Sequence, residues 1–162
     1  MIKPKREEVG FSLIELLIVV TIIGIIASIA IPNLLASRRA ANEASAIASI
    51  RTISSCEITY QATYGGVYGD LPNLGVKTLT DAVLAAAVDA AHAKSGYYFV
   101  ITPVNGAASQ YWAYALPAVT SGIGATGTRR FAVTEDGVLR ADSTLSPPAD
   151  ETVVQAIPPL SN

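Results

Sequence analysis

An acidic residue within a long apolar run is the feature of this sequence with the clearest chemical meaning. Between Phe11 and Ile31 the only ionisable side chain belongs to Glu15. A carboxylate at the centre of a bilayer raises the free energy of insertion by roughly 2.5–3.5 kcal/mol, and by less near the interface. Because such acids are rare and usually functional, the sequence predicts a specific role for Glu15.

Cleavage of the chain between Gly10 and Phe11 would supply a partner for this carboxylate. The cut leaves a positively charged α-amino group on Phe11, about one helical turn before Glu15. That amine can pair with Glu15 of its own subunit, or with Glu15 of a neighbouring subunit in a staggered assembly. Both pairings predict an assembly role for Glu15. The alternative is an acid that merely extends to the lipid headgroups.

The apolar run is long enough to cross a membrane once. About 20 helical residues, at a rise of roughly 1.5 Å each, span the ~30 Å hydrocarbon core. Basic residues precede the run at Lys3, Lys5 and Arg6, and the positive-inside bias places them in the cytoplasm. The residues after Ile31 are then expected outside the membrane.

Two residues are expected to make this helix flexible. Pro32 offers no N–H to the carbonyl of Ser28, and Gly24 costs roughly 1 kcal/mol relative to alanine in a helix interior. The segment between Gly24 and Pro32 is therefore predicted to bend or to unwind locally. The alternative is that Gly24 and Ser28 form a small-residue contact face, as membrane helices commonly do.

One long helix is predicted from Phe11 to about Tyr64, apolar all round at first and amphipathic later. In the second half, apolar residues recur at spacings of three and four, at Ile47, Ile50, Ile53, Cys56, Tyr60 and Tyr64. The charged residues lie mostly elsewhere on the helical wheel, and they include Arg38, Arg39, Glu43, Arg51 and Glu57. Cys56, the only cysteine, is expected to be a buried core residue. Gly65 and Gly66 are expected to end the helix.

The remaining sequence predicts a short helix and a small antiparallel sheet. A loop is expected at residues 65–78, followed by a helix at about 79–94. Runs rich in aromatic and β-branched residues predict strands in two hairpins, at 97–103, 110–116, 130–134 and 138–141. The whole is an α+β arrangement, in which a helical spine packs on a sheet of three to four strands.

The predicted organisation has one globular domain. We expect a leader at 1–10 that is removed on maturation, a transmembrane and filament-core helix at 11–32, a globular domain at 33–141 and an extended tail at 142–162. The tail is expected to be extended or disordered because it contains Pro147-Pro148 and Pro158-Pro159.

Composition and motifs give no indication of an enzyme, a cofactor or a nucleic-acid-binding domain. The net charge of the 162 residues is −2, whereas nucleic-acid-binding domains cluster Lys and Arg on one face. His92 is the only histidine and is expected on the surface. Asp136, Asp142 and Asp150 are available oxygen ligands, but their spacing is not that of a calcium loop, so no metal site is predicted.

The stretch from Gly10 to Asn33, GFSLIELLIVVTIIGIIASIAIPN, resembles the N-terminal motif of type IV prepilins and of type II secretion pseudopilins. The resemblance implies that a prepilin peptidase cuts after Gly10 and that Phe11 becomes the N-methylated first residue. It also implies that Glu15 directs docking into a filament and that the stretch from Gly24 to Pro32 is able to unwind on assembly.

The same resemblance implies a location and a set of partners. The subunit would sit in the bacterial inner membrane with its N-terminus in the cytoplasm, surrounded by lipid, and would then enter an extracellular or periplasmic filament. Its partners would be further copies of the chain, related minor pilins, a prepilin peptidase and methyltransferase, and an inner-membrane assembly platform. Many type IV pilins close a C-terminal loop with a disulfide, which a chain with Cys56 alone cannot form.

Three other interpretations fit parts of the sequence. Within the family, the chain could be a secretion pseudopilin. An ordinary signal peptide cleaved after Ala30 would release a soluble domain beginning at Ile31, although Glu15 interrupts its apolar region and Pro32 follows the cut closely. A membrane-anchored enzyme would need a catalytic motif, and the sequence contains none of the common ones.

Overall fold

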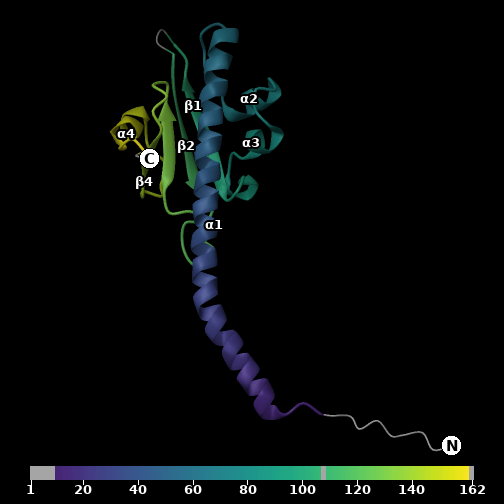
Figure 1. Ribbon diagram of the computed structural model, residues 1–162. Coiled ribbons are helices and arrows are strands. Elements are labelled where there is room, and N and C mark those ends of the chain that lie inside the picture. The colour runs from purple at the N-terminus through teal and green to yellow at the C-terminus, as the bar shows by residue number, and fades with distance from the viewer. Residues whose placement is uncertain (1–9, 107–108, 161–162) are drawn as a thin grey trace, which may run out of the picture. The chain divides into compact units, whose positions relative to one another are not determined.

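A computed structural model describes residues 10–106 and 109–160, so most of the predicted leader lies outside the described residues (Figure 1). The chain divides into two compact units, Met1–Ala36 and Ser37–Asn162. We call the second the globular unit. Helix α1, Leu13–Thr63, contributes residues to both units, and its extent confirms the prediction of one long helix.

The end of α1 follows from two glycines. Gly65 and Gly66 both have positive φ angles, of +79° and +82°, which most other residues adopt only with strain. The N–H of Gly66 donates to the carbonyl of Gln61 at 2.9 Å, which satisfies a carbonyl that the helix end would leave unpaired. The predicted stop at Gly65-Gly66 is therefore confirmed.

A four-stranded antiparallel sheet forms the centre of the globular unit, in the order β1-β2-β3-β4. Its strands are β1 Tyr97–Val104, β2 Gln110–Pro117, β3 Arg130–Thr134 and β4 Arg140–Asp142. The register pairs Phe99 with Ala115, and Ala115 with Phe131. Every strand lies within two residues of its predicted position, which confirms the α+β fold.

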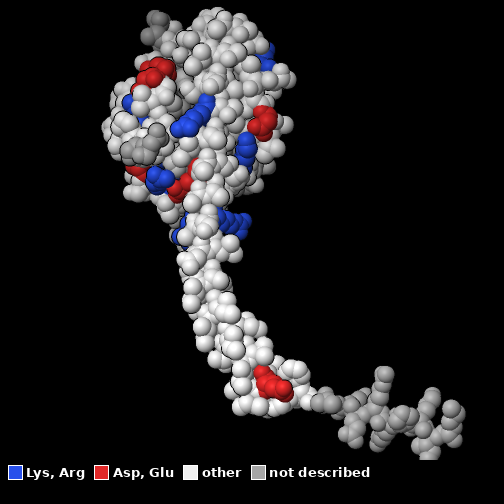
Figure 2. All heavy atoms as spheres, in the orientation of Figure 1, with Lys and Arg blue, Asp and Glu red and all other residues white. Residues whose placement is uncertain are grey.

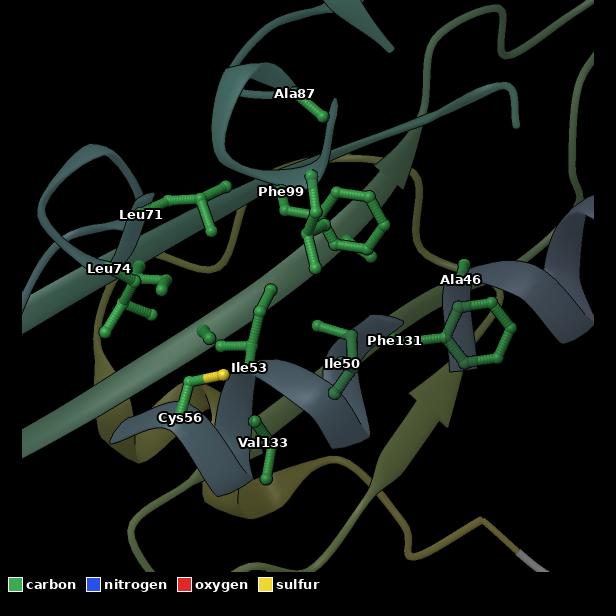
Figure 3. Packing of buried hydrophobic residues seen from close by; sticks show 14 of the residues in the cluster. Ala46, Ile50, Ile53, Cys56, Leu71, Leu74, Ala87, Phe99, Phe131 and Val133 are labelled. Atoms are coloured by element: carbon green, nitrogen blue, oxygen red, sulfur yellow. The ribbon is translucent and has the colours of Figure 1, made fainter. Parts of the chain in front are cut away.

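The second half of α1 packs on one face of this sheet. Ile50 and Ile53 are fully buried and face Phe99, Phe131 and Val133, which alternate along their strands as side chains on one face must (Figure 3). Each fully buried side chain of this kind contributes about 1.5–3 kcal/mol relative to an exposed one. Cys56 is also buried in this cluster, as predicted.

The prediction of one helix at 79–94 is wrong. Three short helical elements lie between residues 71 and 92 instead. They are α2 Leu71–Val76, α3 Ala82–Ala86 and the 3-10 helix η1 Ala90–His92. The carboxylates of Asp70, Asp81 and Asp89 cap these three elements. Helix α3 stops early because the carbonyl of Ala87 accepts the N–H of Phe99 in β1, at 2.8 Å, instead of continuing the helical ladder.

The expectation of an extended C-terminal tail is also wrong. Helix α4, Glu151–Ala156, begins at Asp150, whose carboxylate accepts the N–H of Val153 at 3.0 Å. Val154 and Ile157 are buried against Ala132 of β3, on the face of the sheet opposite α1. The proline pairs flank α4 rather than interrupt it, so they limit the length of this helix without preventing it.

Candidate processing and assembly segment

The predicted cleavage point lies in an exposed stretch before α1. Gly10 and Phe11 are both outside regular secondary structure, and 79% of the Phe11 surface is exposed. A Cβ placed on Gly10 would meet no atom within 4 Å. The peptide bond between these residues is therefore open to an enzyme that binds extended chain.

Glu15 closes the first turn of α1. Its Oε2 accepts the N–H of Ser12 at 3.0 Å, and the carbonyl of Ser12 accepts the N–H of Leu16 at 3.2 Å. This is the reaching-back half of a capping box, in which an acid of the first turn satisfies the amide just before the helix. The carboxylate is also at the positive end of the helix dipole. The carboxylate therefore lies next to Ser12, one residue after the N-terminus that cleavage would create.

The rest of the N-terminal unit presents an apolar surface that nothing in the described part of the chain covers. An 18-residue window of α1 has a mean hydropathy of 2.8, and none of it is buried. Figure 2 shows this segment almost entirely free of charge, apart from one acidic group, which is Glu15 because residues 10–36 contain no other charged side chain. By length and composition, α1 can cross a membrane.

Two hydroxyl side chains within the apolar run bond to the helix backbone. The hydroxyl of Thr21 donates to the carbonyl of Leu17 at 2.8 Å, and that of Ser28 donates to the carbonyl of Ile25 at 2.7 Å. Such bonds to the preceding turn let hydroxyl groups face hydrocarbon. Gly24 and Pro32 both lie inside an unbroken α1, so local unwinding stays a prediction.

A buried glutamate of α1 holds the loop between β2 and β3. Glu43 Oε1 accepts the N–H and the hydroxyl of Thr128 at 2.8 and 2.7 Å, and Oε2 accepts Nε of Arg129 at 3.0 Å. Burial alone would raise the pKa of Glu43, but these bonds hold that pKa below its ordinary value. Asn42 adds a bond from Nδ2 to the carbonyl of Thr126 at 2.9 Å.

Glu43 and Glu57 were expected on the polar side of α1, but both are buried. The signal that could have found them is a spacing of seven, because Glu43, Ile50 and Glu57 follow one another at that interval along the same stripe. Treating charge as a sign of exposure hid this pattern. Both glutamates accept backbone N–H groups from loops, which hydrophobic periodicity does not report.

The aspartates considered as metal ligands have other partners. Asp136 pairs with Arg140 at 2.7 Å, and Asp142 receives a two-pronged contact from Arg130 at 2.7 and 2.8 Å. Asp150 caps α4. Among the described residues, no three His, Cys, Asp or Glu side chains come together as metal ligands would. His92 is exposed, with Nδ1 at 2.9 Å from Oδ1 of Asp89.

Comparison with known proteins places this segment in context. A family profile described as the prokaryotic N-terminal methylation motif matches residues 10–31. The type IV wide pilus major component PilA4 of Thermus thermophilus is 34% identical over 113 residues, which cover 62% of this chain and 86% of PilA4.

Relatives from secretion systems also match the chain. The type II secretion system core protein G of Vibrio cholerae is 36% identical over 59 residues, 36% of this chain and 40% of that protein. The protein of the same name from Escherichia coli is 28% identical over 88 residues, 54% of this chain and 59% of that protein. No solved structure matches the chain.

The fold and the N-terminal segment together define a class of protein, in which an uncovered apolar helix is joined to a globular unit with an antiparallel sheet. The match to PilA4 extends this likeness well beyond the first helix. The chain belongs to the type IV pilin family.

Proposed function

We propose that this chain is a structural subunit of a type IV pilus-like filament, held in the bacterial inner membrane by residues 11–32 before assembly. The observation that carries the proposal is the uncovered apolar surface of α1, which begins at the capping carboxylate of Glu15. In water such a surface is unstable, whereas lipid or the same helix of other subunits would cover it. No catalytic step is needed for this role.

Maturation would begin with a cut after Gly10, followed by N-methylation of Phe11. The new α-amino group would lie one residue before the Ser12 amide, which already donates to Glu15 Oε2. A charged amine is a stronger partner for a carboxylate than an amide N–H. Cleavage would therefore turn a helix cap into a charge pair, formed either within one subunit or between staggered subunits.

The partners follow from this sequence of events. A prepilin peptidase and methyltransferase would act on Gly10 and Phe11, and an inner-membrane platform would pass the subunit into the filament. Further copies of the chain and related minor pilins would supply the helices that replace lipid. The segment between Gly24 and Pro32 would unwind where close packing requires it, because Pro32 leaves the carbonyl of Ser28 without its helical donor.

A role as a secretion pseudopilin is the second candidate, since four of the relatives are core proteins of type II secretion systems. The pilus role is favoured because the alignment covers 86% of PilA4, against 40% and 59% of the secretion proteins from Vibrio cholerae and Escherichia coli. A soluble domain released at Ile31 is disfavoured because α1 continues through this position without a break.

The intact mass and N-terminal sequence of the protein from its native host test the proposal. A chain that begins at methylated Phe11 supports prepilin processing. A chain that begins at Ile31, or that retains the leader after assembly, overturns it. Genes for a retraction ATPase beside this one would favour a pilus, and genes for an outer-membrane secretin with other secretion components would favour a pseudopilus.

A further inference from the structure

Glu57 is a buried acid in the globular unit that plays no part in the role proposed above. Its surface is 0% exposed, although it lies on α1 only about two turns from the helix end. Its Oε2 accepts the N–H of Gly69 at 3.1 Å. Its Oε1 has no hydrogen-bond partner among the protein atoms that the structure describes. If Glu57 were ionised here, a single hydrogen bond would not offset the free energy lost when the carboxylate leaves water.

Within the described part of the chain, no positively charged group acts on the Glu57 carboxyl. Tyr68 and Asp70 come from the segment after α1, Tyr111 comes from β2, and Cys56 is the neighbour on α1 itself. Burial, opposed by the bond from Gly69 and helped by the nearby Asp70 carboxylate, raises the pKa of Glu57 to about 7. The surroundings therefore favour the protonated acid.

The segment over Glu57 contributes one side chain to the core, because Tyr68 is buried and its ring lies 4.7 Å from that of Tyr111. We call residues 65–70 the flap. It leaves α1 through the two positive-φ glycines and meets the β1–β2 turn at Asn105, which bonds both the N–H and the carbonyl of Tyr68, at 2.9 and 3.1 Å. Directly after the flap, Leu71 and Leu74 of α2 are buried in the core. Opening of the flap would expose Glu57 and Gly69 and would also withdraw Tyr68 from Tyr111, so the closed flap is the stable form while Glu57 is protonated.

We propose that Glu57 is a proton-controlled latch, which holds the flap closed when the carboxyl is protonated and releases it when the carboxyl ionises. The direction follows from solvation, because a carboxylate gains more from contact with water than a neutral acid does. Ionisation therefore favours the open flap, in which water reaches Glu57. The repulsion between Glu57 and Asp70 acts in the same direction.

Hydrogen exchange of the Gly69 amide tests the latch, with the full chain in lipid nanodiscs between pH 6 and 8. After correction for the intrinsic exchange rate, the protection of Gly69 should fall about tenfold across this range, because the ionised fraction of Glu57 rises steeply around its pKa. The Phe99 amide, which bonds the carbonyl of Ala87, serves as the internal reference for global unfolding, and Gly69 should stay less protected than Phe99 at every pH.

Two variants make the outcome decisive. Glu57→Gln keeps the acceptor for Gly69 but cannot ionise, so the protection of Gly69 should become independent of pH. Asp70→Asn keeps the cap of α2, since asparagine caps as well as aspartate. Because the Asp70 charge raises the pKa of Glu57, this variant should move the midpoint of the pH transition to lower pH and reduce the total loss of Gly69 protection. The latch is refuted by constant Gly69 protection in the native chain, by equal pH dependence in Glu57→Gln, or by an unchanged midpoint in Asp70→Asn.

Discussion

At the scale of single residues, the glutamates of α1 show how surroundings decide the role of one side chain. Glu15 is exposed and accepts the N–H of Ser12 at the helix start. Glu43 is buried but receives bonds from Thr128 and Arg129. Glu57 is buried and receives one backbone bond. Exposure and the number of donors, rather than the carboxylate itself, separate a proposed assembly residue from a structural anchor and from a proposed latch.

Replacing Glu15 should separate membrane insertion from assembly. In Glu15→Ala, the α-amine of Phe11 loses its proposed partner, and an unpaired buried charge costs about 3–5 kcal/mol. We expect normal amounts of the subunit in the membrane and a severe loss of sheared surface filaments, both measured by immunoblotting. Ser12→Ala is the matched control, because it retains the amide that bonds Glu15. Normal filaments from Glu15→Ala would contradict a role of Glu15 in aligning neighbouring subunits.

The raised pKa of Glu57 predicts that stability depends on pH. The folded chain holds the proton up to about pH 7, whereas the unfolded chain releases it near 4.5. The folded state therefore binds more protons in this range, and its stability should fall as the pH rises from 4.5 to 7. Glu57→Gln should remove this slope and be more stable at pH 8, by on the order of 2 kcal/mol. Urea unfolding at several pH values measures the effect. The prediction is contradicted if the unfolding free energy depends on pH equally in the native chain and in Glu57→Gln.

At the scale of elements, the bond between α1 and the β2–β3 loop depends on Glu43. Glu43→Ala leaves the N–H of Thr128 and the guanidinium of Arg129 without their acceptor, which should cost about 1–3 kcal/mol of unfolding free energy. Because the pKa of Glu43 is lowered, its contribution is present above pH 4.5 and is lost as the pH falls through the folded pKa. Exposed Glu135→Ala is the control. Equal losses in both variants at neutral pH would argue against the anchor.

Adjacent valines in α4 test whether this helix belongs to the core. Val154 is fully buried against Ala132, whereas 36% of the neighbouring Val153 is exposed. Val154→Ala should lower the free energy of unfolding by about 1–3 kcal/mol, and Val153→Ala by less than about 0.5 kcal/mol. Thermal or chemical denaturation of the two variants measures the difference. Equal effects would mean that α4 does not pack on the sheet in solution.

The elements that the sequence predicted are those with strong local signals. The length of α1 and the alternation in β1 and β2 appear directly in the order of apolar residues. Helix α4 was missed because its signal is a single capping aspartate and two buried side chains, beside prolines that suggest extended chain. The early end of α3 was missed because it depends on a hydrogen bond from Phe99 to Ala87. No local pattern reports a contact with a strand further along the chain.

The residues of the candidate site differ in whether they are neighbours in the sequence or are brought together only by folding. Gly10, Phe11 and Glu15 are identified by their order in one short stretch, so the sequence alone is enough to propose them. The loop contacts of Glu43 and Glu57 join residues far apart in sequence and depend on the fold. Their spacing of seven from Ile50 marks the shared stripe, but not the loops that cover it.

At the scale of the whole molecule, each unit has its own source of stability. The globular unit contains the sheet, the apolar core against α1 and the ion pairs Arg130–Asp142 and Arg140–Asp136. The N-terminal unit has no buried core among its described residues and must obtain its stability from lipid or from other helices. This division predicts that folding of the globular unit and assembly of the filament can be separated.

A chain that begins at Ser37 provides the test of this separation. It retains every residue of the core cluster and the contacts of Glu43, so it should fold and unfold cooperatively, remain monomeric in water and form no filaments. Circular dichroism during urea unfolding, sedimentation and electron microscopy measure these three properties. The comparison is the full chain in nanodiscs, whose globular unit should unfold at a similar urea concentration, since the urea midpoint reflects the stability of the same core. Filaments formed by the shortened chain would contradict assembly through α1, and a chain unfolded without residues 1–36 would contradict the independence of the globular unit.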